Sequence, residues 1–204
     1  MSQIERLVEM MQTLRGEGGC PWDRQQTHAS LVQYLIEESY EAVDAIESGD
    51  DAELREELGD VLFQVVFHAE IARSEGRFAF EDVAQAVADK MESRHPHVFG
   101  DADADIESVR ANWEVLKAAE AGKTERVHVD DGIPAALPAL QRAQKVLSRM
   151  KRRDMAVPAA SNADVQSEQQ LGEVLLGLVQ TAREHGWDAE RALRDAVRGV
   201  TERS

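Results

Sequence analysis

Two acidic motifs decide the fold: Glu37-Glu38-Ser39-Tyr40-Glu41 and, after a short turn, Glu57-Leu58-Gly59-Asp60. Both lie in segments with helical periodicity. Each motif places two carboxylates three residues apart, Glu38 with Glu41 and Glu57 with Asp60, so that the pair shares one helix face. Between residues 37 and 60 there are eleven acids and one base. So many like charges on neighbouring helices need a counter-charge, and a divalent cation with oxygen ligands would supply one.

The position of these acids on their helices favours a common centre. On a helical wheel Glu38 falls inside the apolar stripe of its helix, whereas Glu37 points further outward. The two helices are joined by the tight turn Ser48-Gly49-Asp50, so we expect them to pack antiparallel with both acidic pairs at a similar height. The alternative is a solvated acidic face, which is the usual meaning of an acidic run on a helix.

Apolar residues recur at helical spacing through most of the chain, and no segment alternates for long enough to predict a strand. We expect helices at residues 2–15, about 27–48, 51–75, 81–93, 106–121, 134–152, 164–185 and 188–202. Residues 97–105 and 154–163 are expected to be loops, and the polar stretch 122–133 a linker. The predicted fold class is all-α, a helical bundle.

Composition narrows the classes of partner. The chain has 204 residues, 43% of them hydrophobic, and a formal net charge of −16. A chain so acidic should repel nucleic acid and anionic membranes, so neither is expected as a partner. Its apolar runs are too short to span a bilayer, and its start lacks a signal-peptide core. With a single cysteine, Cys20, no internal disulfide can form, and a cytoplasmic location is expected.

Other acid-rich helical proteins fit the motifs less well. A di-iron bundle needs a histidine three residues after a glutamate, twice, and positions 41 and 60 hold Glu and Asp instead. His68 is expected to be a packed or hydrogen-bonded histidine. Prenyl-diphosphate synthases also pair acidic motifs with Mg²⁺, but theirs are rich in Asp and set far apart in longer chains.

Two basic and aromatic pairs are candidates for contacts with phosphate or base. Lys90 and Arg94 are four residues apart on one expected helix, as are Trp113 and Lys117 on the next. Lys and Arg bind phosphate oxygens, and Trp can stack on a base. Taken alone, each pair has an ordinary alternative: a solvated basic face, or a tryptophan in the core or at an interface.

The second half of the chain faintly repeats the first. Glu57-Leu58-Gly59-Asp60 is echoed by Gln170-Leu171-Gly172-Glu173 at an offset of 113 residues, and Ala72–Gly76 by Ala182–Gly186 at an offset of 110. No acidic pair corresponds to Glu37-Glu38 in the second half. If the repeat is real, any catalysis should reside in residues 1–121.

Residues 1–121 resemble the MazG family of nucleoside triphosphate pyrophosphohydrolases. The resemblance rests on Cys20-Pro21-Trp22-Asp23, Gln26-Thr27, the two acidic motifs, Arg94-His95-Pro96-His97-Val98-Phe99 and Asn112-Trp113-Glu114. It implies an all-α homodimer that hydrolyses (deoxy)nucleoside triphosphates to monophosphate and pyrophosphate with Mg²⁺, or with Mn²⁺ as the alternative metal. The metal ligands would be Glu38, Glu41, Glu57 and Asp60, and the nucleotide contacts Lys90, Arg94, Trp113 and Lys117. Glu37 is the candidate to orient or deprotonate the water.

The resemblance also divides the chain into a MazG-like catalytic domain at 1–121, a linker at 122–133 and a helical region at 134–204. This last region resembles only the later part of a second such domain, and its acidic motif is degenerate. A second hypothesis follows: the chain is a helical dimer whose truncated half serves regulation or interaction. A third is a narrower specificity, such as dUTP or a damaged nucleotide.

Overall fold

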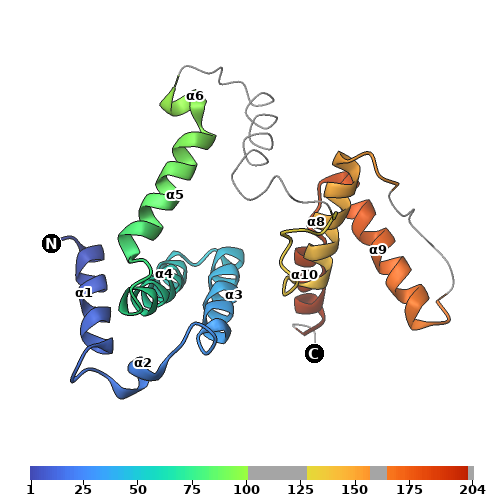
Figure 1. Ribbon diagram of the computed structural model, residues 1–204. Coiled ribbons are helices and arrows are strands. Elements are labelled where there is room, and N and C mark those ends of the chain that lie inside the picture. Colours follow the sequence, from blue (N-terminus) through green and yellow to red (C-terminus); the bar gives the residue numbers. More distant parts are fainter. Residues whose placement is uncertain (101–127, 157–164, 202–204) are drawn as a thin grey trace. The chain divides into compact units, whose positions relative to one another are not determined.

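The protein is described by a computed structural model over residues 1–100, 128–156 and 165–201 (Figure 1). Within these residues every regular element is a helix, which confirms the predicted all-α class. The helix expected at 106–121 lies outside them. The chain divides into two compact units, Met1–Lys117 and Ala118–Ser204. None of the described helices is long and apolar enough to cross a membrane.

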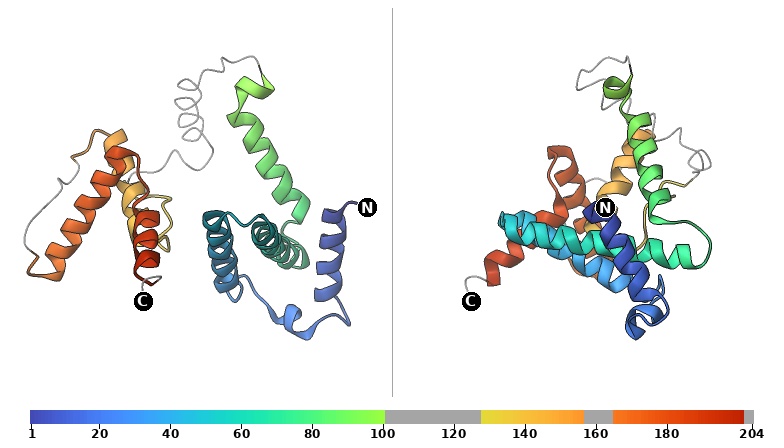
Figure 2. Two further views of the ribbon diagram at one scale, coloured as in Figure 1. Left: turned by 180° about the vertical axis from the view of Figure 1, so that it is seen from behind. Right: turned by 90° about the vertical axis from the view of Figure 1, so that its left-hand side faces the viewer.

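Unit 1 is built around one long helix. Its described helices are α1 (Gln3–Arg15), α2 (Pro21–Gln25), α3 (Val32–Ser48), α4 (Asp51–Ser74), α5 (Phe80–Arg94) and α6 (Pro96–Phe99). The 24-residue α4 contacts α3, α1 and α5 (Figures 1 and 2). Helix α4 therefore carries side chains of the acidic motif at one end and the unit's core at the other.

The turn between α3 and α4 fixes the antiparallel pairing that the sequence predicts. Gly49 ends α3 with φ +76°, a left-handed conformation in which glycine avoids a Cβ penalty. Asp50 then caps α4, because its carboxylate accepts from the backbone N–H groups of Ala52 and Glu53. With only two residues between the helices, α3 must return along α4.

The core of unit 1 gathers apolar residues from α1, α4 and the approach to α3. Its buried members are Met11, Leu31, Val66, Phe67 and Ile71. The guanidinium of Arg15, which donates to backbone carbonyls at the end of α2, lies 5.4 Å from the Phe67 ring centroid. These contacts tie α1, α2 and α4 together and hold the start of α3 in place.

Some helices begin or end at other residues than the sequence predicts, because local turns compete with helix formation there. Helix α3 begins at Val32 rather than near 27, because Thr27 and Ser30 exchange side-chain to backbone hydrogen bonds that favour a turn. Short helices α2 and α6 form in stretches where the sequence predicts no helix, each with proline at its first position.

Unit 2 packs three described helices, α8 (Ala139–Arg152), α9 (Glu168–His185) and α10 (Ala189–Thr201). Helix α8 begins later than the expected residue 134, after two prolines at 134 and 138. The buried apolar side chains include Leu147 and Val179. The Gln144 side chain donates to the Trp187 carbonyl at 2.6 Å and accepts from the Ala189 N–H, which fixes the turn between α9 and α10.

Candidate metal centre

Helices α3 and α4 bring three of the predicted carboxylates together. One oxygen from each of Glu38, Glu41 and Glu57 lies within 4.8 Å of the other two. Glu38 and Glu57 are half-buried and Glu41 is exposed. Asp60, also exposed, lies outside this group of three. Glu37, the predicted base, is exposed on α3 and is not a member either.

Burial and the neighbouring carboxylates raise the pKa of Glu38 and of Glu57. The pKa of Glu38 lies above its ordinary value, first because burial penalises the charged form, then because of the charges of Asp60 and Glu41. The pKa of Glu57 is raised by burial and by the charges of Glu41 and Asp60, with smaller effects from Glu56 and Glu53. Asp60 therefore acts on the group electrostatically although it is not within it. No Lys or Arg of the described residues is among the groups that shift either pKa.

One carboxylate oxygen of this group is buried and has no partner. Glu57 Oε2 is shielded from solvent and makes no hydrogen bond within the described structure. A buried charged acceptor without a donor is costly. Together with the mutual repulsion of the three carboxylates, it means that the group lacks a positive partner.

A divalent cation fits this group of residues. Hard oxygen donors suit Mg²⁺ or Mn²⁺, and three carboxylates would offset the cation's charge. Glu38 and Glu41 could bind from α3 and Glu57 from α4 through the oxygen that has no other partner. The assignment of these residues, and of Asp60, as metal ligands stays a prediction.

Of the four predicted nucleotide contacts, two lie on α5 and two lie outside the described residues. Lys90 is exposed and borders a cavity of about 430 Å³ together with Phe78, Asp82 and Val87. Arg94 is half-buried at the last turn of α5. Trp113 and Lys117 lie outside the described residues. The roles of all four toward nucleotide stay predictions.

His68 and Trp22 have packing roles in the structure. His68 stacks on His28 with a ring-centroid distance of 5.1 Å, and their Nδ1 atoms are 2.8 Å apart, which confirms a packed, hydrogen-bonded histidine. Burial and the neighbouring His28 lower the pKa of His68. Trp22 packs edge-on against Tyr34 at 5.9 Å and remains half-exposed. No local sequence pattern indicates His28 as the partner of His68, since forty residues separate them.

The fold and site together define an all-α protein with an acidic cluster shared by two antiparallel helices. Residues 26–99 match the family model described as MazG nucleotide pyrophosphohydrolase domain. The nucleoside triphosphate pyrophosphohydrolase of Escherichia coli K12 is 43% identical over 219 residues, covering 96% of this chain and 83% of the relative. The nucleoside triphosphate pyrophosphohydrolase/pyrophosphatase MazG of Thermotoga maritima is 39% identical over 216 residues, covering 98% and 83%. The chain therefore belongs to the MazG family of nucleoside triphosphate pyrophosphohydrolases.

These alignments also show that the relatives are longer. The alignment to the E. coli protein extends over 219 positions, more than the 204 residues of this chain, so the relative has residues that this chain lacks. An uncharacterized 26.1 kDa protein of Streptomyces cacaoi is 46% identical over 195 residues, covering 94% of this chain and 76% of that protein. The family is thus shared over nearly the whole chain.

Proposed function

We propose that this chain hydrolyses nucleoside triphosphates at the α–β phosphate bond, releasing nucleoside monophosphate and pyrophosphate, in a reaction that depends on Mg²⁺. The observation that carries the proposal is the group formed by Glu38, Glu41 and Glu57, with its unpaired buried oxygen. Family membership supports the reaction class. The biological role we propose is the removal of unwanted nucleotides from the cytoplasmic pool.

Each residue has a defined task in this proposal. A bound Mg²⁺ would offset phosphate charge and lower the pKa of a coordinated water. Glu38, Glu41 and Glu57 would hold the cation, with Asp60 at the edge of the site. Lys90, Arg94 and Lys117 would offset the remaining phosphate charge, and Trp113 would hold the base or sugar.

The attacking water needs a group that orients it or takes its proton. Glu37 is our candidate, because it adjoins Glu38 on α3 but stays outside the group of three carboxylates. A carboxylate that is not engaged by the cation keeps its lone pairs available for a water proton.

The test is pyrophosphate release from each dNTP, with and without Mg²⁺, for the wild-type chain and for Glu38→Gln. This substitution keeps the shape of the side chain and removes one charge. The proposal expects metal-dependent release that the variant loses, with an unchanged circular-dichroism spectrum. Equal release by both proteins would reject the site, and release of phosphate instead of pyrophosphate would reject the α–β bond.

Two alternatives stay open beside this proposal. A narrower specificity, for example dUTP or a damaged nucleotide, would show as one preferred substrate in the same screen. The other is a helical homodimer with a regulatory or interaction role and little hydrolysis, motivated by the degenerate acidic motif of the second half. It predicts that removing residues 122–204 abolishes partner binding; unchanged hydrolysis after that removal would keep the site within residues 1–121.

A further inference from the structure

Helix α3 carries two of the three carboxylates of the candidate metal centre but buries little apolar surface of its own. Its buried residues are Ala42 and Ala45, both small. Leu31, directly before α3, is buried in the core of unit 1. Apolar contacts are not directional, so they leave the rotation of α3 about its own axis weakly fixed. The carboxylates of α3 reach α4 at only one such rotation.

Hydrogen bonds fasten the segment before α3 to α4 and to the turn after α4. Arg77 Nη2 contacts His28 Nε2, and His28 Nδ1 lies 2.8 Å from His68 Nδ1. We refer to these three residues as the histidine chain. Thr27 and Ser30 exchange hydrogen bonds on either side of His28, which holds the turn before α3 in one conformation. Three separate segments of unit 1 are thus joined by directional contacts.

The donors and acceptors of the histidine chain follow from its chemistry. A guanidinium can only donate, so His28 Nε2 accepts from Arg77 and carries no proton. A neutral His28 then has its proton on Nδ1 and donates it to His68 Nδ1. A neutral His68 holds its proton on Nε2, which is buried and has no partner in the described structure. The chain is complete only while both imidazoles are neutral, because a second proton on either ring removes an acceptor that the chain uses.

The surroundings of the two histidines disfavour a positive charge on them. Burial and the neighbouring His28 lower the pKa of His68. From the turn after α4, Arg77 brings a positive charge to His28, and Glu75 accepts from Arg77 Nε at 2.7 Å. The turn before α3 contributes His28 itself. The histidine chain therefore forms at neutral pH, and acid opens it.

We propose that the histidine chain positions the metal centre, because it sets the rotation of α3 at which the carboxylates of that helix meet Glu57. Glu38 lies between two attachments of α3, namely this chain on one side and the tight turn to α4 on the other. On α4, Glu57 and His68 are eleven residues apart and share one face of the helix. The inference rests on the proposed function, since it concerns the metal that the proposed reaction needs.

The test is the binding of Mn²⁺ to the full chain without nucleotide, followed by the loss of the free-ion signal in electron paramagnetic resonance. His28→Leu removes both hydrogen bonds of the ring. His28→Gln keeps an acceptor for Arg77 and a donor for His68, because an amide has both. At pH 7.5 we expect His28→Leu to weaken Mn²⁺ affinity at least about fivefold and His28→Gln to change it less than about twofold. His185→Leu, a matched removal of a histidine that stacks on Trp187 in unit 2, should leave the affinity unchanged.

The pH dependence separates a positioning role from a structural one. In acid the wild-type histidines become protonated and the histidine chain opens, so wild type should lose its advantage over His28→Leu. We expect the difference in affinity at pH 7.5 to shrink below about twofold at pH 5. Protonation of the carboxylates weakens Mn²⁺ binding in both proteins, and the ratio of the two affinities cancels that shared effect.

A second pair of variants keeps the inference testable if His28→Leu does not fold. Arg77→Met removes one hydrogen bond from an exposed residue and should weaken Mn²⁺ binding about threefold at pH 7.5, whereas Arg77→Lys keeps a donor and should restore most of the affinity. Folded variants that bind Mn²⁺ as tightly as wild type, or a difference for His28→Leu that persists at pH 5, would overturn the positioning role alone. Wild type that binds no Mn²⁺, or Glu38→Gln that binds it equally well, would contradict the metal centre itself and with it the proposed function.

Discussion

The two units of this chain share three helices and differ in a fourth. Helices α1, α4 and α5 of unit 1 follow the same order as α8, α9 and α10 of unit 2, and the described residues of unit 2 contain no counterpart of α3. The ends of α4 and α9 match at an offset of 110 residues, since Arg77 N–H donates to Ala72 and Trp187 N–H to Ala182. In this register Glu57 corresponds to Ser167, the residue that caps α9, and Asp60 to Gln170. The acidic group therefore depends on two features that the described part of unit 2 does not have: a helix paired like α3, and a helix that extends as far toward its N-terminus as α4 does.

The two halves of the chain also differ in net charge. Residues 128–204 hold eleven acids and eleven bases, so the entire net charge of −16 belongs to residues 1–127. Uncompensated acids thus accumulate on the side of the chain that carries the candidate metal centre. In the proposed function, a cation bound with the anionic nucleotide would offset part of this charge.

The largest expected difference between the units is in catalysis. Glu38→Gln should lower kcat/KM for pyrophosphate release at least about 100-fold, because the group loses a charged ligand in a reaction that depends on metal charge. Glu173→Gln, the same change of residue type at a carboxylate on α9, should change it less than about twofold. Steady-state release of pyrophosphate from dNTPs measures both.

The comparison between the two variants is informative only if both are folded. Circular dichroism and thermal melting of each should match wild type to within a few degrees. A large loss of activity in Glu173→Gln would show that the degenerate motif still takes part in hydrolysis, against our division of the chain.

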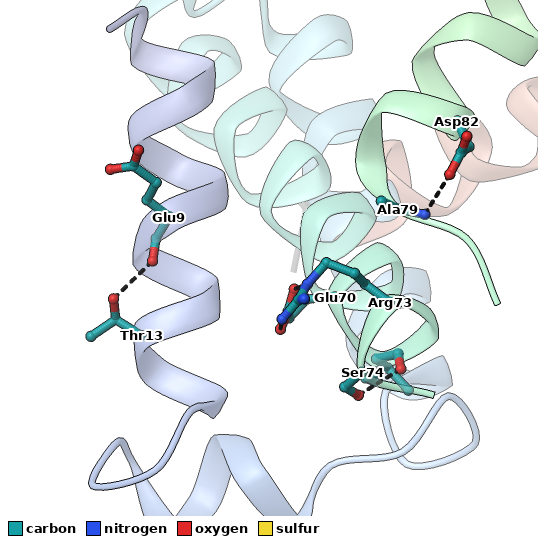
Figure 3. Close-up of polar contacts among 8 residues, drawn as sticks. Glu9, Thr13, Glu70, Arg73, Ser74, Ala79 and Asp82 are labelled. Carbon is teal, nitrogen blue, oxygen red and sulfur yellow. Dashed lines mark hydrogen bonds and ion pairs between the residues drawn. The ribbon is translucent and has the colours of Figure 1, made fainter. Parts of the chain in front are cut away.

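The next largest expected effect is on the free energy of unfolding, through two polar pairs at matching places near the ends of α4 and α9. Arg73 donates to Glu70 on α4, as Figure 3 shows, and Arg183 donates to Gln180 on α9. Glu70→Ala leaves a guanidinium beside a buried surface and should cost about 2 kcal/mol, since breaking a buried ion pair is expensive but Arg73 is about half exposed. Gln180→Ala removes an uncharged side chain that accepts from Arg183 and donates to Glu184, and it should cost less, about 1 kcal/mol, because no buried ion pair is broken. Urea unfolding, followed separately for each unit by a tryptophan signal, measures the two values. Equal costs would contradict the difference in charge between the two pairs.

Much of this organisation could be predicted from the sequence. The acidic motifs, the tight turn at Gly49 and the helical periodicity predict the α3–α4 pair, and the structure has it. The offset of 110 between Ala72–Gly76 and Ala182–Gly186 is also the register that the helix ends adopt. The echo of Glu57–Asp60 by Gln170–Glu173 was misleading, because it lies three residues out of that register.

What the sequence could not predict depends on side chains meeting across the fold. The stacking of His28 on His68 joins residues forty positions apart, and no local pattern signals it. Local hydrogen bonds between Thr27 and Ser30 delay the start of α3 by competing with helix formation. Wheel geometry places Asp60 at the edge of the stripe, but only packing decides that Glu38, Glu41 and Glu57 form the closest group.

Mg²⁺ should stabilise unit 1 by an amount that depends on pH. The raised pKa values of Glu38 and Glu57 mean that the folded, metal-free protein binds more protons than the unfolded chain. Protonation at low pH relieves the repulsion between these carboxylates and so favours the folded state. This contribution to stability is lost as the pH rises through the raised pKa values of the folded protein. Because these groups are partly exposed, solvent screening should keep the effect small.

Differential scanning fluorimetry tests this in both metal states. We expect Mg²⁺ to raise Tm more at pH 7.5 than at pH 5, since protons compete with the cation for the same oxygens. In Glu38→Gln both the pH dependence and the metal effect should shrink. A metal effect of equal size at both pH values would argue against binding by these carboxylates.

The smallest predicted effect compares the glycines that follow α4 and α9. Gly76→Ala and Gly186→Ala should each cost about 1 kcal/mol, because each places a Cβ in a left-handed conformation. Gly172→Ala is the control, since Gly172 lies inside α9 with open space around its Cα, and alanine there should stabilise by about 0.5 kcal/mol. Equal costs at 76 and 186 would support the shared helix ending on which the register of the two units depends. A cost at 186 well below that at 76 would mean that the turn after α9 rearranges, and the correspondence of Glu57 with Ser167 and of Asp60 with Gln170 would lose its support.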